Sequence, residues 1–474
     1  MPHFVLLLVV FLPIVWLWTV RQKRVFYPPG PSGFPIIGNV TQMPVLYQWL
    51  EFTERAREFG PIFHLSALGT SMIVLSSEKV IRDLCEKRGL IYSDRPNLPM
   101  SGQLMGYDRS IAMAPLGRYH KDGRKAVLRA TTNRQIHMYQ SVQESKTIVF
   151  LKAVLAKPDE IMDHIRRHVA AVVLKISHGY DIQAMGTDPI VQLAEQALDE
   201  FGRAIAPGAY LVDVFPILLK VPAWFPGARW KRQGFKWRAT AIRLRDEPFD
   251  MVKDQVKKGT AEPSLIAEAI RTNPNPSAYE DEIQRWTFFL AMALNPDVQK
   301  KAQAEIDRVV GLNRLPVFAD REHLFYVNAI VKEVLRWKPI LPLGLPHATT
   351  RDDVYSGFYI PAGTVVWNNI WSLCRESQLY PDPDQFYPER FLYREKANGM
   401  NPDPEKYVFG FGRRLCPGLR MADATLFITI ARTLTVFSIS NVRRDSGVLI
   451  KSENDLLYSG SLFFHPKFAH YLLL

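Results

Sequence analysis

Ten residues near the end of the chain, 409–418, constrain its fold and chemistry more than any other segment. They read FGFGRRLCPG and place one cysteine, Cys416, directly before a proline and a long apolar run. Because proline suits the first position of a helix, we expect Cys416 to lie at a helix N-terminus. The free amides and the dipole at a helix start lower the pKa of a thiol and favour the thiolate.

The other residues of this loop suit a flat or bulky group that carries acid. Gly410, Gly412 and Gly418 let the backbone pass close to such a group. Arg414 offers it a cation, and a soft thiolate in these surroundings suits haem iron. Considered alone, a cysteine is most often a small buried apolar residue, so the interpretation depends on the motifs that precede the loop.

Three more segments precede this loop. Glu333 and Arg336 form an E-x-x-R pair inside a helix predicted over 326–338. Their spacing puts both side chains on one helix face, although an isolated pair of this kind is usually solvated and worth only ~0.3 kcal/mol. Residues 345–347 read LPH, and residues 386–391 read FYPERF.

Together and in this order, these segments resemble the cytochrome P450 family over almost the whole chain. The haem-binding loop of that family has the pattern Phe-x-x-Gly-x-Arg-x-Cys-x-Gly. Phe409, Gly412, Arg414, Cys416 and Gly418 match this pattern. The resemblance implies haem b as the cofactor, Cys416 as the axial ligand of its iron, and the other four residues as parts of the cofactor-binding loop.

The resemblance further implies that Glu333, Arg336 and Arg390 form a structural set and that His347 meets a haem propionate. In overall style the chain is similar to fungal microsomal members of the family. Such a protein is expected to be mainly α-helical with a minor β portion. It is expected to be a monooxygenase that oxidises a small lipophilic substrate with dioxygen, in secondary metabolism.

The electrons for such a reaction are expected from a partner, because the chain shows no P-loop and no G-x-G-x-x-G fingerprint for flavin or nicotinamide. The resemblance implies NADPH-cytochrome P450 reductase, with cytochrome b5 as a further candidate donor.

Residues 117–125, GRYHKDGRK, occupy the place of a W-x-x-x-R helix whose Trp and Arg contact a propionate in that family. Here His120 stands at the Trp position and Arg124 at the Arg position. Both side chains can still donate to a carboxylate. The resemblance therefore implies that both bind the cofactor, with His120 as a departure from the family pattern.

A second departure lies where a long distal helix should cross the haem face. In the family, an acid and a threonine of this helix relay protons to dioxygen. Here residues 281–286 (DEIQRW) run directly into 287–294 (TFFLAMAL), and a helix of this length spans only about 21 Å. An altered transcript with an inactive product is one explanation. A haem-thiolate isomerase or a peroxide-using enzyme, which needs no threonine, is the other; Thr287 is assigned no relay role.

Residues 4–20, FVLLLVVFLPIVWLWTV, carry no charge and are just long enough to span a bilayer. The bases Arg21, Lys23 and Arg24 follow, which places that side in the cytosol. We expect residues 1–24 to be a single-pass signal anchor in the endoplasmic reticulum membrane. A cleaved signal peptide is the alternative, but it would need basic residues before the apolar run.

Residues 25–40 are rich in proline and are expected to form a stiff, extended hinge. Asn39 begins a glycosylation sequon that would face the cytosol. With no linker after the hinge, residues 41–474 are expected to form one haem domain.

Hydrophobic periodicity within that domain predicts a second helix over 297–310 and short strands over 62–65, 72–75 and 354–360. Residues 421–438 form an apolar run long enough to suggest a second membrane span. Asp423 and Arg432 favour a buried core helix instead.

The chain is basic, with 59 Lys and Arg against 47 Asp and Glu and a net charge of +12. Such a balance suggests a membrane surface, an acidic protein or nucleic acid as partner. Residues 229–245 carry seven bases, no acid and two tryptophans, after an apolar, proline-broken segment at 211–227. This combination favours a membrane-facing surface over nucleic acid, and a solvated basic helix is the alternative.

The remaining candidate ligands are weak. The three cysteines, Cys85, Cys374 and Cys416, include no C-x-x-C pair, which argues against a disulfide framework and favours a reducing compartment. His164 and His168 lie four residues apart, as metal ligands on a helix can, but have no third ligand in view. A solvated helix is the alternative interpretation of the pair.

Overall fold

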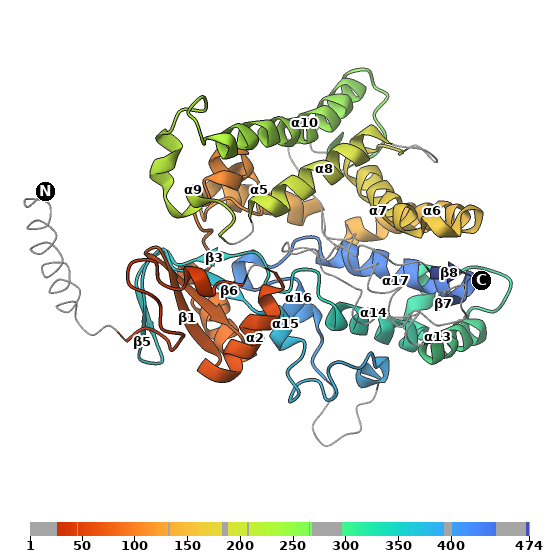
Figure 1. Ribbon diagram of the computed structural model, residues 1–474. Coiled ribbons are helices and arrows are strands. Elements are labelled where there is room, and N and C mark those ends of the chain that lie inside the picture. Colours follow the sequence, from red (N-terminus) through yellow and green to blue (C-terminus); the bar gives the residue numbers. More distant parts are fainter. Residues whose placement is uncertain are drawn as a thin grey trace, which may run out of the picture.

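The computed structural model describes residues 26–44, 46–130, 133–182, 188–205, 208–264, 266–267, 296–392, 401–441 and 471–473. Across these ranges the chain is mainly helical with a minor sheet portion, the four-stranded sheet lying to one side (Figure 1), as the predicted mainly helical fold class expects. The apolar segment 4–20 and the distal segment 281–294 lie outside the described residues. In the described ranges, no helix is both long and apolar enough to cross a membrane.

A four-stranded sheet joins the start of the chain to the region before the Cys416 loop. Its order is β1-β2-β6-β3, with β2 and β6 parallel and the other pairs antiparallel. The strands predicted at 62–65 and 72–75 are confirmed, but the single strand predicted over 354–360 is wrong. That stretch is a hairpin, because Ser356 and Gly357 turn the chain with φ of 52° and 83°. The strands are β1 (Ile62–Ala67), β2 (Thr70–Leu75), β3 (His347–Ala348), β4 (Asp353–Tyr355), β5 (Phe358–Ile360), β6 (Val365–Asn368), β7 (Ile439–Asn441) and β8 (Tyr471–Leu473).

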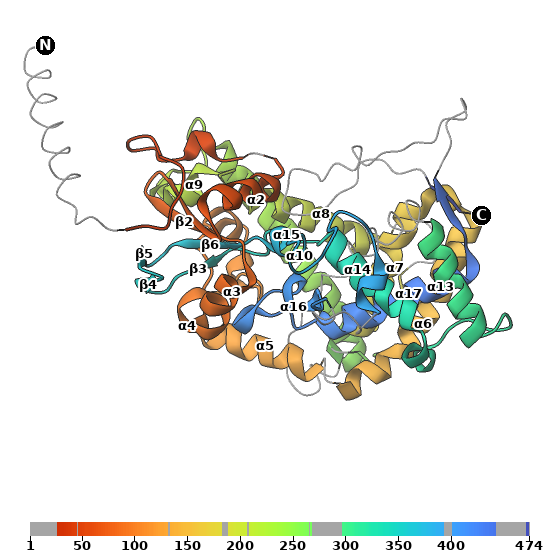
Figure 2. The same ribbon diagram turned by 90° about the horizontal axis from the view of Figure 1, so that it is seen from below.

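The predicted long helices are all present as α13, α14 and α17. The apolar run at 421–438 is α17, which packs against α6, α13 and α14 (Figure 2). Its side chains are largely buried, as the core-helix interpretation expects. Arg432, the one base within residues 421–438, donates to the carbonyl oxygens of Pro316 (2.7 Å) and Glu144 (2.6 Å). The helices are α2 (Gln48–Phe59), α3 (Glu78–Ile81), α4 (Gly89–Tyr92), α5 (Arg118–Ala130), α6 (Asn133–Ala156), α7 (Ile161–His178), α8 (Pro189–Ala204), α9 (Leu211–Val214), α10 (Arg229–Lys257), α13 (Pro296–Val309), α14 (Phe325–Trp337), α15 (Ile370–Leu373), α16 (Glu405–Val408) and α17 (Leu419–Val436).

The described part of the proline-rich segment lies on the sheet. The carbonyl oxygen of Pro29 accepts the N–H of His64 in β1 at 2.8 Å. Asn39 is buried; its amide donates to Pro31 at 3.0 Å, and its Oδ1 accepts the N–H of Ser66 at 2.8 Å. Because this amide is buried and bonded, the sequon at Asn39 is inaccessible in the folded protein.

A small apolar cluster joins α9 and α10 to η3, a π-helical turn. Asp213 of α9 lies at its edge and accepts the N–H of Met100 at 2.8 Å. Burial raises the pKa of Asp213 to about 7 from an ordinary value of 3.8. The turn η3 is Met100–Leu104, and the cluster consists of Met100, Leu104, Met105, Ala204, Val212 and Trp237.

Replacing Asp213 by Asn should stabilise the protein at pH 8. Folded Asp213 keeps its proton where the unfolded chain has released it, so wild-type stability falls as pH rises from 3.8 to about 7. The side-chain amide of the Asp213→Asn variant would still accept from Met100 but does not ionise. We expect a gain of about 1–4 kcal/mol at pH 8 in urea unfolding, shrinking toward pH 5.

The exposed Asp250 supplies the control for this prediction, since Asp250→Asn should have little effect at either pH. A stability difference for Asp213→Asn that is equal at pH 5 and pH 8 would contradict the buried carboxyl account.

Candidate functional site

Cys416 lies half-buried between η9, a 3-10 turn over Gly412–Arg414, and the start of α17. Its N–H donates to the carbonyl oxygen of Phe409 at 2.8 Å, and its Sγ accepts the N–H of Gly418 at 3.2 Å. The prediction that Pro417 opens the helix is wrong, because α17 begins at Leu419 with Gly418 as N-cap. An amide of the helix start still reaches the sulfur, and such donation favours the thiolate.

The shape of the loop before Cys416 depends on glycine. Gly410 and Gly412 have φ of +81° and +54°, a region that disfavours other residues. A Cβ on Gly412 would lie 2.4 Å from the carbonyl oxygen of Cys85, which belongs to the neighbouring π-helical turn. The close approach that the sequence predicts at Gly412 is therefore made to another part of the chain.

Arg414 is buried and points away from solvent into the segment that precedes α5. It donates to the carbonyl oxygens of Ser93 (Nε, 2.8 Å) and Ala114 (Nη2, 2.7 Å). Burial lowers the pKa of Arg414 to about 10, so the side chain is cationic at neutral pH. These bonds hold the guanidinium of a residue that lies two positions before Cys416 in the sequence. Because both acceptors are neutral carbonyl oxygens, the positive charge of Arg414 is not compensated by them.

Arg95 is a second buried guanidinium of this site, and no sequence pattern points to it. It donates to the carbonyl oxygens of Ala112 (2.7 Å), Leu345 (3.0 Å) and Pro346 (2.6 Å). Burial and the nearby charge of Arg414 lower its pKa. Arg95 stands outside any recognisable motif, and only the fold brings it beside Arg414.

His347, His120 and Arg124 complete the cluster. His347 in β3 is buried, with Nδ1 at 2.9 Å from the carbonyl oxygen of Tyr92. Burial, and then Arg95, lower its pKa to about 3; burial, and then Arg414 and Arg124, lower the pKa of His120 to about 4. Both rings are therefore neutral at pH 7 and carry one N–H each, and that of His347 is the one that donates to Tyr92.

Arg124 links this cluster to the thiol. It is partly buried on α5, and burial lowers its pKa while the charge of Cys416 raises it. The structure thus brings together the loop, α5 and β3 residues that the sequence predicts for cofactor binding, and it adds Arg95. We name Arg95, His120, Arg124, His347 and Arg414 the basic cluster.

The basic cluster fits a cofactor that carries carboxylates. The hydrogen bonds of Arg95 and Arg414 described above all go to neutral carbonyl oxygens. The acid that acts on both groups electrostatically is Asp94. Buried guanidinium groups without a matching anion are costly. Acidic propionates at the cluster and iron at Cys416 would satisfy both ends of the site, so these residues fit haem b.

A buried ionic network lies behind the site. Arg336 donates to both carboxylate oxygens of Glu333 at 2.8 and 2.9 Å, and Arg390 donates to Glu333 at 3.2 Å. Arg336 also donates to the carbonyl oxygens of Cys374 (2.8 Å) and Pro383 (2.7 Å). Glu333 and Arg336 are fully buried, so they are not a solvated helix pair.

Two other predicted features lie apart from this site. His164 has Nε2 at 2.8 Å from the carbonyl oxygen of Lys157, and His168 stacks on Phe150 with Nε2 at 3.2 Å from the Thr429 hydroxyl. Both rings are buried, so the solvated-helix interpretation is wrong. No group of three potential metal ligands gathers anywhere in the described ranges.

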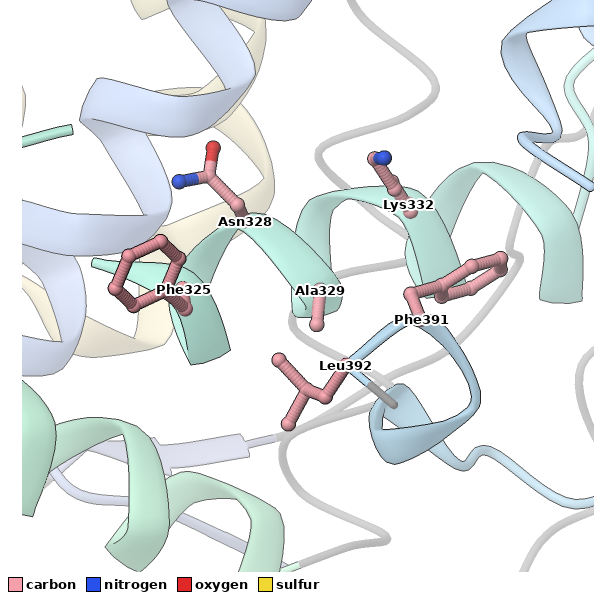
Figure 3. A pocket seen from close by; sticks show the side chains of 6 residues that line it. All are labelled: Phe325, Asn328, Ala329, Lys332, Phe391 and Leu392. Carbon is pink, nitrogen blue, oxygen red and sulfur yellow. The ribbon is translucent and has the colours of Figure 1, made fainter. Parts of the chain in front are cut away.

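A separate pocket lies beside α14 (Figure 3). It includes no residue of the basic cluster and is distinct from the Cys416 site. Its rim residue Lys332 is paired with Asp403 at 2.8 Å. The pocket is lined by Phe325, Asn328, Ala329, Lys332, Phe391 and Leu392.

Removing one partner of the buried network should be strongly destabilising. Arg336→Met leaves the Glu333 carboxylate buried with one cation fewer, and we expect a loss of about 3–5 kcal/mol in urea unfolding. Arg82→Met, which breaks the partly exposed pair with Glu78 (2.7 Å), should cost at most about 1 kcal/mol. Equal losses in the two variants would contradict the role of burial.

The sequence of this chain matches a family model and a group of fungal proteins. The family model for cytochrome P450 matches residues 28–261 and 284–464. Cytochrome P450 monooxygenase claR of Ampulloclitocybe clavipes is 38% identical over 98% of this chain and 90% of its own length. Cytochrome P450 monooxygenase 208 of Postia placenta is 39% identical (93% and 88%), and cytochrome P450 monooxygenase COX2 of Coprinopsis cinerea is 40% identical (92% and 87%).

These matches also bear on the distal segment. The family match stops at residue 261 and resumes at 284, so the unmatched residues 262–283 lie just before the junction between residues 286 and 287. The alignment with claR extends over 488 positions, although it covers 98% of a chain of 474 residues. The relative therefore has residues for which this chain has no counterpart.

Proposed function

The chain belongs to the cytochrome P450 family, and on that premise we propose how it works. It is an oxidoreductase of the monooxygenase kind, and proteins of this family bind haem b. We infer that it takes electrons from NADPH-cytochrome P450 reductase and oxidises a small lipophilic substrate with dioxygen, in secondary metabolism. The observation that carries this proposal is the half-buried Cys416 thiol, which lies between a helix start and the basic cluster.

Each residue of the site has a distinct task in this proposal. Cys416 would supply the thiolate ligand of the haem iron, and the Gly418 N–H, which donates to its sulfur, would orient the sulfur and favour its anionic form. Arg95, Arg414 and Arg124 would hold the propionates by charge and His120 would donate to them as a neutral ring, while His347, whose single N–H donates to the Tyr92 carbonyl oxygen, would lie beside them. When bound, haem supplies the iron at which dioxygen is activated, and thiolate ligation favours O–O cleavage.

Electron delivery requires a docking surface near Cys416. Exposed bases surround the loop on two elements, and such a surface attracts an acidic partner. This supports docking of the reductase on the Cys416 side. The bases are Arg118, Lys121 and Lys125 on α5 and Arg413 and Arg420 beside Cys416.

The surface around α9 supports an association with membrane. Leu211 (63% exposed), Ile217 (62%) and Trp224 (78%) present apolar side chains to solvent, next to the bases that open α10. In Figures 1 and 2 this region and the described start of the chain lie at the same end of the molecule. With residues 1–24 as anchor, the protein would be a single-pass protein of the endoplasmic reticulum, its haem domain in the cytosol.

The proposal is tested by the absorption of the reduced, carbon monoxide-bound protein. The wild type should show the long-wavelength band that is diagnostic of thiolate ligation, and Cys416→Ala should lose it completely. Cys85→Ala is the control, because the Cys85 thiol is buried against Asn368 and only the backbone carbonyl of this residue meets the Cys416 loop, at Gly412. Survival of the band in Cys416→Ala would rule out the assignment.

Charge reversal at the docking surface should weaken the reductase interaction alone. For Lys121→Glu with Arg413→Glu, we expect the KM for reductase to rise about tenfold and its dependence on salt to flatten. Lys253→Glu, on the exposed side of α10, is the matched control. Unchanged kinetics in the double variant would contradict docking on this surface.

The interrupted family match supports a second candidate function. If the distal segment is as short as the junction suggests, this chain is either the inactive product of an altered transcript or an isomerase or peroxide-using enzyme. Sequencing full-length transcripts separates these cases. A longer message that restores Gly-x-Asp-Thr before Phe288 identifies this chain as the altered form. Activity with peroxide but not with NADPH and reductase supports the alternative enzyme.

A further inference from the structure

Asp94 occupies a position that the proposed function does not use. It follows α4 and lies between two residues of the site, Ser93, which accepts from Arg414, and Arg95. Its Oδ1 accepts the N–H of Arg95 at 2.9 Å and the N–H of Leu116 at 2.7 Å. These bonds place an acid at the centre of a basic site.

Asp94 also connects three segments of the chain. Its carbonyl oxygen accepts the N–H of Ala348 at 2.8 Å, which joins it to β3 directly after His347. Its carboxylate bond to Leu116 joins it to the approach of α5, which carries His120 and Arg124. One residue therefore ties together the α4 end, the α5 approach and β3, each of which supplies part of the basic cluster.

The Asp94 carboxylate offsets positive charge in the basic cluster without occupying the N–H donors of the guanidinium groups. Both of its described hydrogen bonds are to backbone amides, whereas the guanidinium groups of Arg95 and Arg414 bond carbonyl oxygens. Its charge acts on both arginines and on His120 through space. Asp94 thus changes the charge of the site without using donors that a ligand needs.

The resulting net charge matches the cofactor. Arg95, Arg124 and Arg414 bring three positive charges and Asp94 brings one negative charge, so the site carries two positive charges when the imidazoles are neutral. Haem b carries two propionates. Without Asp94, three cations would face two carboxylates, and the excess charge would favour reduced iron.

We propose that Asp94 is a positioning residue for haem b, which sets the charge of the basic cluster and joins the segments that hold the propionates. This inference rests on the proposed function, because it assumes that the propionates bind at the basic cluster. Asp94 has two roles in this proposal: it supplies a negative charge, and it accepts hydrogen bonds from backbone N–H groups. Different substitutions remove these two roles.

Two variants test these roles separately. Asp94→Asn removes the charge but retains an oxygen that can accept from Arg95 and Leu116. It should shift the midpoint potential of the iron to a more positive value while the rate of haem transfer to apomyoglobin does not increase. Asp94→Ala removes both roles and should lose haem on the order of tenfold faster. Asp108→Asn, an exposed acid on a nearby turn, is the control for both measurements.

Each outcome decides between the explanations. A midpoint potential in Asp94→Asn that equals that of Asp108→Asn overturns the charge role. Haem loss in Asp94→Ala at the wild-type rate overturns the acceptor role, and apoprotein unfolding shows whether either variant is simply unfolded. If the wild type itself lacks the thiolate band, the proposed function fails; if it has the band and the variants do not respond, only the role of Asp94 fails.

Discussion

Guanidinium groups buried without a hydrogen bond to a carboxylate are the constraint around which this site is organised. Taking such a group out of water costs several kcal/mol unless hydrogen bonds and an opposite charge compensate for the loss. Arg95 and Arg414 have the hydrogen bonds, from carbonyl oxygens of residues 93–114 and 345–346. The one acid that acts on both, Asp94, does not balance two guanidinium groups, which makes this region a preformed site for an anion beside the Cys416 thiol.

The Glu333 network shows the contrasting case, in which each buried guanidinium is hydrogen-bonded to a carboxylate. Glu333 accepts from two arginines and from the N–H of Tyr387 (2.7 Å), while the arginines also bond carbonyl oxygens of residues 374–385. This closed set joins α14 to the segment that leads to the Cys416 loop. The carboxylate-bonded network stabilises the fold, whereas the basic cluster, in which the guanidinium groups of Arg95 and Arg414 bond carbonyl oxygens, is suited to binding an anionic cofactor.

Much of this site can be predicted from the sequence, because its motifs are local. Cys416, Arg414 and Gly412 lie within one loop, and the Glu333–Arg336 pair needs only helical spacing. Residues that depend on long-range contacts are harder to predict. Arg95 gains its role from carbonyl oxygens near residues 112 and 346, which no local pattern reveals.

The same difference between local patterns and long-range contacts applies to the fold. Long helices such as α14 and α17 have apolar runs that predict them closely, whereas the short strands β3 and β6 are not predicted. Their pairing with each other and with β2 depends on the tertiary structure. The helix start at Leu419 differs from the prediction because Pro417 and Gly418 form a turn ahead of α17, so proline's preference for the first helical position is overridden locally.

The central claim is that the basic cluster is completed by the propionates of a haem whose iron is bound by Cys416. Its most direct test is the affinity of the apoprotein for haem b and for haem dimethyl ester, which has the same iron and ring but no propionate charge. We expect the ester to bind more weakly, by on the order of 100-fold or more, since two charge-assisted interactions are lost. Equal affinity for the two compounds would contradict the claim.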